Sequence, residues 1–170
     1  MKIRPETEAD HPAIRKVNEE AFRDQITAGL VETIRKTDRF VPELSLVAEV
    51  EGEVVGHVML SFVDIEPGPR RVLQVGPLAV MPSYQRRGIG SALMKEAIRL
   101  VDARGEPLIL IEGNPRYYER FGSTRADESG IETPKGAHGP QYFMVRALTT
   151  YDPDLRGQAV YPPETFGTVI

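Results

Sequence analysis

Apolar side chains recur every three or four residues in three segments of the chain, a spacing that predicts amphipathic helices. The predicted helices cover residues 9–23, 28–36 and 87–104. Thr7 is a residue type that caps helix N-termini, and Gly105 fits a C-terminal cap after the third helix. The third helix has the most regular stripe of residues expected to be buried, which consists of Ile89, Leu93, Ala97, Leu100 and Val101.

Shorter runs rich in apolar and β-branched residues predict strands. The predicted strands cover residues 3–4, 44–50, 54–63, 71–80, 108–111 and 142–148. A turn at residues 51–53 joins the second and third of these strands into a hairpin. The uniformly apolar run at residues 108–111 is typical of a strand at the centre of a sheet.

The remaining segments carry weaker signals. A short helix is predicted at residues 116–121, because Pro115 suits the first helical position and Gly122 suits the end. We expect a loop at residues 124–140, which are rich in glycine and proline, and irregular structure in the proline-rich tail from Tyr151.

The composition is that of an ordinary globular domain with a slightly acidic balance. The chain has 170 residues, of which 41% are hydrophobic and 27% charged, and its formal net charge is −4. We therefore expect one domain and no nucleic-acid partner, because lysine and arginine are not in excess. No apolar run approaches the roughly 20 residues needed to span a bilayer, so we expect no membrane partner.

The numbers of cysteines and histidines limit which kinds of reaction and binding site the chain can support. The chain has no cysteine, which excludes disulfides and thiolate chemistry. Its charged N-terminal segment is unlike a secretory signal, and together these features favour a cytoplasmic location. The three histidines are scattered at His11, His57 and His138, so we expect no metal site.

Residues 85–93, with the sequence Gln-Arg-Arg-Gly-Ile-Gly-Ser-Ala-Leu, are the most informative stretch. Gly88 and Gly90 lie where a predicted strand is followed by the long helix. The first turn of a helix has unpaired N–H groups and a positive dipole end, which together bind phosphate. Arg86 and Arg87 add positive charge. This combination predicts a pyrophosphate site.

Two familiar nucleotide-binding patterns do not match this stretch. A dinucleotide-binding fold needs a third glycine at the position of Leu93 and a strand–helix–strand unit. A nucleotide-triphosphate loop needs Gly-Lys-Ser/Thr, which the chain lacks.

The surrounding segment, residues 75–94, resembles the acetyl-CoA-binding segment of the GNAT superfamily of N-acetyltransferases. The family signature Gln/Arg-x-x-Gly-x-Gly/Ala matches Gln85, Gly88 and Gly90, and here too it follows a Leu-Ala-Val strand. A second motif, residues 113–122, resembles the family's other cofactor-side segment. It is similar to the version found in a bacterial subgroup of predicted acetyltransferases.

The second motif reads Gly-Asn-Pro-Arg-Tyr-Tyr-Glu-Arg-Phe-Gly and places Tyr118 where the family has a tyrosine. The chain departs from the family after Gly122, because Ser123 replaces a phenylalanine that usually packs. The resemblance implies an α/β (α+β) fold: a mixed, mostly antiparallel central sheet with splayed fourth and fifth strands, flanked by helices. It also implies that residues 1–149 form the acetyltransferase domain and that residues 150–170 form a tail packed on it.

The resemblance further implies acetyl-CoA as co-substrate, without a metal. In the family the pantetheine arm pairs with the backbone of the fourth strand, and the loop before the long helix wraps the pyrophosphate. The residues that this implies as cofactor contacts are Leu78, Ala79, Val80, Gln85, Arg86, Arg87, Gly88, Ile89, Gly90, Ser91, Ala92, Asn114, Tyr117 and Phe121.

Acyl transfer to an amine needs a neutral amine, a polarised thioester carbonyl and a proton for the leaving thiolate. By analogy with the family, Tyr118 is expected to donate that proton. Glu112, at the end of the central apolar strand, is the expected general base, acting directly or through a water. Glu20 and Glu49 are the alternatives. His57 is expected to be a packed histidine.

The sequence thus predicts an enzyme that moves an acetyl group from acetyl-CoA to a primary amine by direct attack in a ternary complex. A catalytically weak acyl-CoA-binding sensor or regulator would share the same phosphate cradle and is the alternative. The acceptor would be a small-molecule or peptide amine, and no motif specifies it. His138 is expected to be solvated in a loop that could border the acceptor pocket. A homodimer formed through the C-terminal strand or tail is compatible with the sequence.

Overall fold

Two long strands of the computed structural model, β3 (Glu53–Glu66) and β4 (Arg70–Val80), each contribute residues to both of its compact units. The structure describes residues 1–68, 70–163 and 165. The first unit contains residues 1–61 and 76–100, and the second unit contains residues 62–68, 70–75, 101–163 and 165.

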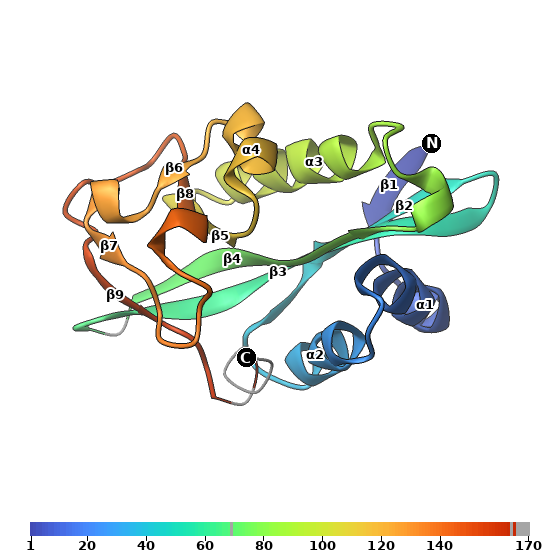
Figure 1. Cartoon of the computed structure of the whole chain (residues 1–170), viewed down its shortest axis with the longest axis horizontal. Helices are drawn as coiled ribbons and strands as arrows, with labels where there is room; N and C mark the ends of the chain where they lie inside the picture. Colours follow the sequence, from blue (N-terminus) through green and yellow to red (C-terminus); the bar gives the residue numbers. More distant parts are fainter. Residues whose placement is uncertain (69, 164, 166–170) are drawn as a thin grey trace. The chain divides into compact units, whose positions relative to one another are not determined.

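The first unit is built on antiparallel strands with helices on both faces (Figure 1). Its elements are β1 (Lys2–Pro5), α1 (His11–Phe22), α2 (Ile26–Arg35), β2 (Phe40–Val50), parts of β3 and β4, most of α3 (Ile89–Ala103), and 3₁₀ turns at Glu8–Asp10 and Pro82–Tyr84. β2 pairs with β1 on one side and with β3 on the other, so that Ile3 lies opposite Ala48 and Val47 lies opposite His57.

Two consecutive residues of β3 mark the two faces of this sheet, because successive side chains on a strand point to opposite sides. The His57 ring lies 3.2 Å from the amide nitrogen of Asn18 on α1. At Gly56, an added Cβ would lie 3.0 Å from both Ile89 Cγ2 and Leu93 Cδ1 of α3. Therefore α1 and α2 cover one face and α3 covers the other (Figure 1), and Gly56 allows α3 to approach closely.

A buried polar cluster lies under α1 and α2 in the first unit. Glu6 accepts hydrogen bonds from Arg35 at 2.7 and 3.1 Å and another from Ser45. His57 is 0% exposed, and its Nε2 lies 3.0 Å from Ser45 Oγ and 3.5 Å from Glu6 Oε2. Burial raises the pKa of Glu6, but the hydrogen bonds from its three partners outweigh burial and lower that pKa to about 2. Burial is the main cause that lowers the pKa of His57. The ring is fully buried, so the expectation of a packed histidine is confirmed.

Among its described strand pairings, the second unit has two parallel pairs beside three antiparallel ones. Its remaining elements are β5 (Leu108–Glu112), α4 (Pro115–Tyr118), β6 (Thr124–Arg125), β7 (Ile131–Glu132), β8 (Phe143–Ala147), β9 (Gly157–Val160), and 3₁₀ turns at Glu119–Phe121, Asp127–Ser129 and Pro140–Tyr142. β5 runs parallel to β4, with Leu73 opposite Ile109 and Val75 opposite Ile111, and antiparallel to β8. Residues 108–111 are all fully buried, as the prediction of a central strand required.

The predicted helices and longer strands are present, with ends shifted by a few residues. The predicted fold class, a mixed and mostly antiparallel sheet flanked by helices, is confirmed. The described register between β4 and β5 covers only three residue pairs, the last of which is Val75 with Ile111. Within the described residues, no helix is both long and apolar enough to cross a membrane.

Two expectations about irregular structure were wrong. Residues 124–140 contain β6, β7 and a 3₁₀ turn, and the tail contains β9, which pairs with both β3 and β7. Strands of two to four residues are too short to show an alternating pattern, so only their partners stabilise them. Gly157 opens β9 with a φ of 143°, and an added Cβ there would lie 2.1 Å from the Glu66 carbonyl oxygen. The close approach of the two backbones requires glycine at this position. Because glycine is not typical of strands, it also weakens the sequence pattern that would have predicted β9.

Candidate active site

The first turn of α3 offers unpaired backbone donors at its N-terminus. The first helical hydrogen bond runs from the Ala92 N–H to the Gly88 carbonyl at 3.0 Å. Within the described residues, the N–H groups of Ile89, Gly90 and Ser91 have no acceptor, as expected of a first helical turn. Gly88 has a φ of 82° and open space where a Cβ would lie, so its backbone conformation, not packing, favours glycine. This end of α3 therefore suits an anion.

The loop that leads into α3 is exposed and carries positive charge. Arg86 has a φ of 63°, and the Arg87 guanidinium lies 5.2 Å from the centre of the Tyr84 ring. The side-chain amide of Gln85 donates a hydrogen bond to the Val80 carbonyl at 3.0 Å. This signature glutamine therefore ties the loop to the last residue of β4.

The end of β4 leads directly into this loop. Ala79 is buried, whereas Leu78 and Val80 are half-buried and their side chains lie on the same face of the strand. The Met81 N–H donates to the Val55 carbonyl at 2.8 Å, which anchors the end of β4 to β3 within the first unit.

The second predicted cofactor segment forms α4 and the 3₁₀ turn after it. Asn114 caps α4, because its side-chain oxygen accepts a hydrogen bond from the Arg116 N–H at 3.0 Å. Tyr117 lies edge-to-face against Tyr118 and Phe121, with ring centres 4.9 and 5.5 Å apart. The structure thus brings Asn114, Tyr117, Tyr118 and Phe121 together in the second unit.

Tyr118 lies against the backbone at the end of β5. Its ring occupies the space above Gly113, where an added Cβ would lie 2.6 Å from Tyr118 Cε2. Burial is the main cause that raises the pKa of Tyr118, and Tyr117 adds to it. The phenol is therefore protonated at neutral pH, which is the form a proton donor needs. The raised pKa also makes transfer of its proton to a thiolate less favourable.

Glu112, the last residue of β5, has partners on both carboxylate oxygens. Oε1 accepts hydrogen bonds from the His138 N–H at 2.8 Å and from His138 Nδ1 at 2.6 Å. Oε2 accepts one from the Tyr161 hydroxyl at 2.6 Å, and that hydroxyl accepts one from Gln74 Nε2 at 2.9 Å. Gln74 and Tyr161 are buried, and the Glu112 side chain is 16% exposed.

The two alternative bases have surroundings unlike those of Glu112. Glu20 lies on α1 with its carboxylate 3.9 Å from Lys16 Nζ, and its side chain is well exposed. Glu49 accepts a hydrogen bond from Arg4 Nε at 3.1 Å. Glu112 is followed directly by Gly113, whose backbone lies against the Tyr118 ring.

Comparison with known proteins identifies the family. The model of the acetyltransferase (GNAT) family matches residues 11–122. The chain is 32% identical over 164 residues to the N-acetyltransferase YjhQ of Escherichia coli K12, itself described as uncharacterized, with 92% of this chain and 91% of YjhQ covered. This chain belongs to the GNAT acetyltransferase family.

Two solved structures are similar to this acetyltransferase over nearly its whole length. The Escherichia coli GNAT family N-acetyltransferase YhbS in complex with CoA has a TM-score of 0.87 and 26% identity, covering 96% of this chain and 90% of YhbS. A GNAT family acetyltransferase from Brucella melitensis in complex with acetyl-CoA has a TM-score of 0.79 and 30% identity, covering 96% of both chains.

Three residues near the predicted site of this acetyltransferase, Gly113, Gln74 and Tyr161, had no signal that singled them out in the sequence. Gly113 belongs to the second motif, but its contact with Tyr118 depends on how β5 meets α4. Tyr161 donates to Glu112, and Gln74 donates to Tyr161, from segments far away along the chain. Ser123, the departure from the family pattern, is buried, and within the described residues its hydroxyl has no hydrogen-bond partner.

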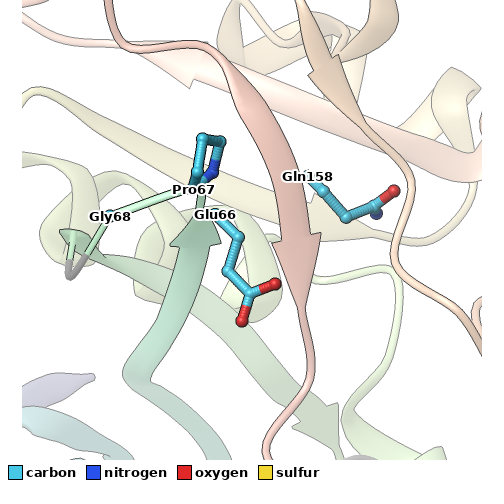
Figure 2. Close-up of a pocket in the computed structure, with 4 residues that line it drawn as sticks. All are labelled: Glu66, Pro67, Gly68 and Gln158. Carbon is cyan, nitrogen blue, oxygen red and sulfur yellow. The ribbon is translucent and has the colours of Figure 1, made fainter.

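A separate pocket of about 710 Å³ lies at the end of β3 beside β9 and is lined by Glu66, Pro67, Gly68 and Gln158 (Figure 2). Gln158 Nε2 donates to the carbonyls of Thr133 and Ala159, at 2.7 and 2.9 Å, so its amide is already engaged. None of the predicted site residues lines this pocket, and we assign it no role in acetyl transfer.

Proposed function

We propose that this GNAT acetyltransferase moves an acetyl group from acetyl-CoA to a primary amine by direct attack in a ternary complex. The observation that carries the proposal is the exposed loop before α3, with its unpaired N–H groups and two arginines. The YhbS structure holds CoA and the Brucella structure holds acetyl-CoA, which supports the same co-substrate for this chain.

In this proposal the pyrophosphate binds at the N-terminus of α3. The N–H groups of Ile89, Gly90 and Ser91 would donate to its oxygens, and Arg86 would balance part of its charge. The backbone of residues 78–80 would pair with the pantetheine arm like an added strand. The further proposed contacts are Gln85, Arg87, Gly88, Ala92, Asn114, Tyr117 and Phe121.

The proposed chemistry needs one group to donate a proton and one to accept a proton. Tyr118 would protonate the leaving thiolate, because its phenol keeps its proton at neutral pH. Glu112 would take part in removing the proton from the amine. The acceptor would be a small-molecule or peptide amine, and we propose a cytoplasmic setting.

The test separates an enzyme from a binding module that lacks catalytic activity. Calorimetric titration with acetyl-CoA would measure binding. Incubation with acetyl-CoA and a panel of polyamines, aminoglycosides, amino acids and peptides with free N-termini would measure amine-dependent release of free thiol. We expect binding together with thiol release that at least one amine stimulates. Tight binding without any amine-stimulated thiol release would contradict the enzymatic proposal and favour a sensor module.

A further inference from the structure

The His138 ring is held in one orientation by Glu112. Both the backbone N–H and Nδ1 of His138 approach the same oxygen, Glu112 Oε1, at 2.8 and 2.6 Å. An ionised carboxylate can only accept hydrogen bonds, so the proton of the neutral ring is on Nδ1. Nε2 is then left with a free lone pair, and the His138 side chain is 75% exposed. The result is a basic nitrogen of fixed direction that faces solvent.

Glu112 is itself fixed from its other side. Its Oε2 accepts the hydrogen bond of the buried Tyr161 hydroxyl at 2.6 Å, and Gln74 Nε2 donates to that hydroxyl at 2.9 Å. Three donors thus approach the two oxygens of Glu112, two of them from His138. Nε2 of His138 is the solvent-facing acceptor at the end of this chain of hydrogen bonds.

The pair lies at the end of β5 that also holds Tyr118. Gly113 follows Glu112 directly, and the Tyr118 ring packs over Gly113. The Gly113 N–H donates to the Tyr142 carbonyl at 2.9 Å. This hydrogen bond holds the end of the loop that contains His138 beside the same end of β5. All of these residues belong to the second unit. One strand end therefore positions both a proton donor and a proton acceptor.

We propose that Nε2 of His138 is the general base of the acetyl transfer and that Glu112 is a positioning residue that fixes the tautomer of His138. The inference rests on the proposed function and adds the identity of the base. Such a carboxylate–histidine pair also stabilises the imidazolium once it forms, because the negative charge lies directly against Nδ1–H.

The proposed step balances in protons and electrons. Nε2 takes one proton from the ammonium form of the acceptor, which leaves a neutral amine. The amine lone pair forms the C–N bond at the thioester carbonyl carbon, and the C–S bond breaks with its electron pair on sulfur. The sulfur takes the Tyr118 hydroxyl proton, and the Tyr118 oxygen recovers the second proton of the attacking nitrogen. The His138 imidazolium then loses its proton to solvent, so one amide, one thiol and one proton are formed.

The tautomer is tested first, without any acceptor. A long-range ¹H–¹⁵N spectrum of the histidine rings, assigned by loss of the His138 signals in His138→Asn, reports which ring nitrogen carries the proton. We expect the Nδ1–H form in the wild-type protein and a mixture of tautomers in Glu112→Gln. A neutral ring protonated at Nε2 in the wild-type protein would overturn the proposal.

The second test separates a base from a structural residue. His138→Ala should lower kcat by about 10²- to 10⁴-fold with the best amine of the panel, without a change in acetyl-CoA affinity. With hydroxylamine, whose nitrogen is uncharged at neutral pH, the loss should be less than about tenfold because no base is needed to free its lone pair. Added imidazole should restore turnover of His138→Ala but not of Tyr118→Phe. His11→Ala is the matched control, since His11 Nε2 also lies near a carboxylate, 3.3 Å from Glu6 Oε1.

The outcomes distinguish this inference from the proposed function. Equal losses with both nucleophiles, or no rescue by imidazole, would remove His138 as the base while leaving an acetyltransferase. Failure to bind acetyl-CoA or to acetylate any amine would instead contradict the proposed function, and the tautomer measurement would still decide the geometry of the pair. Loss of activity in His11→Ala equal to that in His138→Ala would mean that the effect is not local, and would also count against the inference.

Discussion

Gly113→Ala should separate the position of Tyr118 from its chemistry. An added Cβ would lie 2.6 Å from Tyr118 Cε2 and 3.3 Å from Cδ2. Carbon atoms in favourable contact are about 3.5–4.0 Å apart, so the ring must retreat by about 1 Å. A misplacement of that size costs about 10²-fold in rate when the displaced group takes part in the reaction. Overpacking of this kind also costs about 1–3 kcal/mol of folding free energy.

The assay combines turnover, binding and stability. We expect kcat for acetyl-CoA-dependent thiol release to fall about 100-fold in Gly113→Ala, with acetyl-CoA affinity unchanged and the urea midpoint lowered. Gly29→Ala is the matched control, because Gly29 lies in α2 and an added Cβ there meets nothing within 4 Å. That variant should keep full kcat and gain about 0.5–1 kcal/mol of stability.

A double-mutant cycle decides whether the loss passes through Tyr118. If the ring position is the cause, adding Gly113→Ala to Tyr118→Phe should cause little further loss of kcat. Full kcat in Gly113→Ala, or losses that multiply in the double variant, would refute the reasoning that the glycine acts by placing the phenol.

Three further predictions rest on separate parts of the chain. Tyr118→Phe should lower kcat about 10²- to 10⁴-fold and spare acetyl-CoA affinity measured by calorimetry; unchanged turnover would remove Tyr118 as the acid. Gly90→Asp should weaken acetyl-CoA binding at least about tenfold by steric conflict and like-charge repulsion, while the urea midpoint stays close to that of the wild type; unaltered affinity would place the pyrophosphate elsewhere. The folded-state pKa values of Glu6 and His57 are both lowered, so their contributions to stability are present at neutral pH and lost in acid. His57 should lose its contribution as the pH falls below about 6.5, where the unfolded chain takes up a proton. Glu6 should lose about 3 kcal/mol as the pH falls from 4.5 towards 2, and urea unfolding of Glu6→Gln across this range should show a flatter acid limb than the wild type.

The candidate site was predictable from the sequence where its chemistry depends on neighbours along the chain. The loop before α3 is such a case, because glycine conformation, arginine charge and the bare first helical turn all follow from about nine consecutive residues. The Asn114 cap and the aromatic group of α4 are local in the same way. The roles of these residues toward acetyl-CoA remain predictions that the experiments above would test.

The surroundings of Glu112 could not be predicted in this way. Sequence reasoning placed Glu112 at a strand end as a base and His138 in a solvated loop. The structure joins them at 2.6 Å, because β5 and β8 pair antiparallel and return the loop before β8 to the end of β5. The partner on the other oxygen, Tyr161, comes from a tail that the sequence predicted to be irregular.

The sequence by itself determined the longer helices and strands, the family and the conformation-bearing glycines and arginines of the loop before α3, because each of these depends on periodicity or on adjacent residues. Only the tertiary structure decided that Glu112 holds His138, that Gly113 makes room for Tyr118, and that the tail contributes β9 and Tyr161. The physical reason is that hydrogen bonds and close backbone approaches between distant segments leave no repeating pattern along the chain. They become visible when strand pairing brings those segments to the same place.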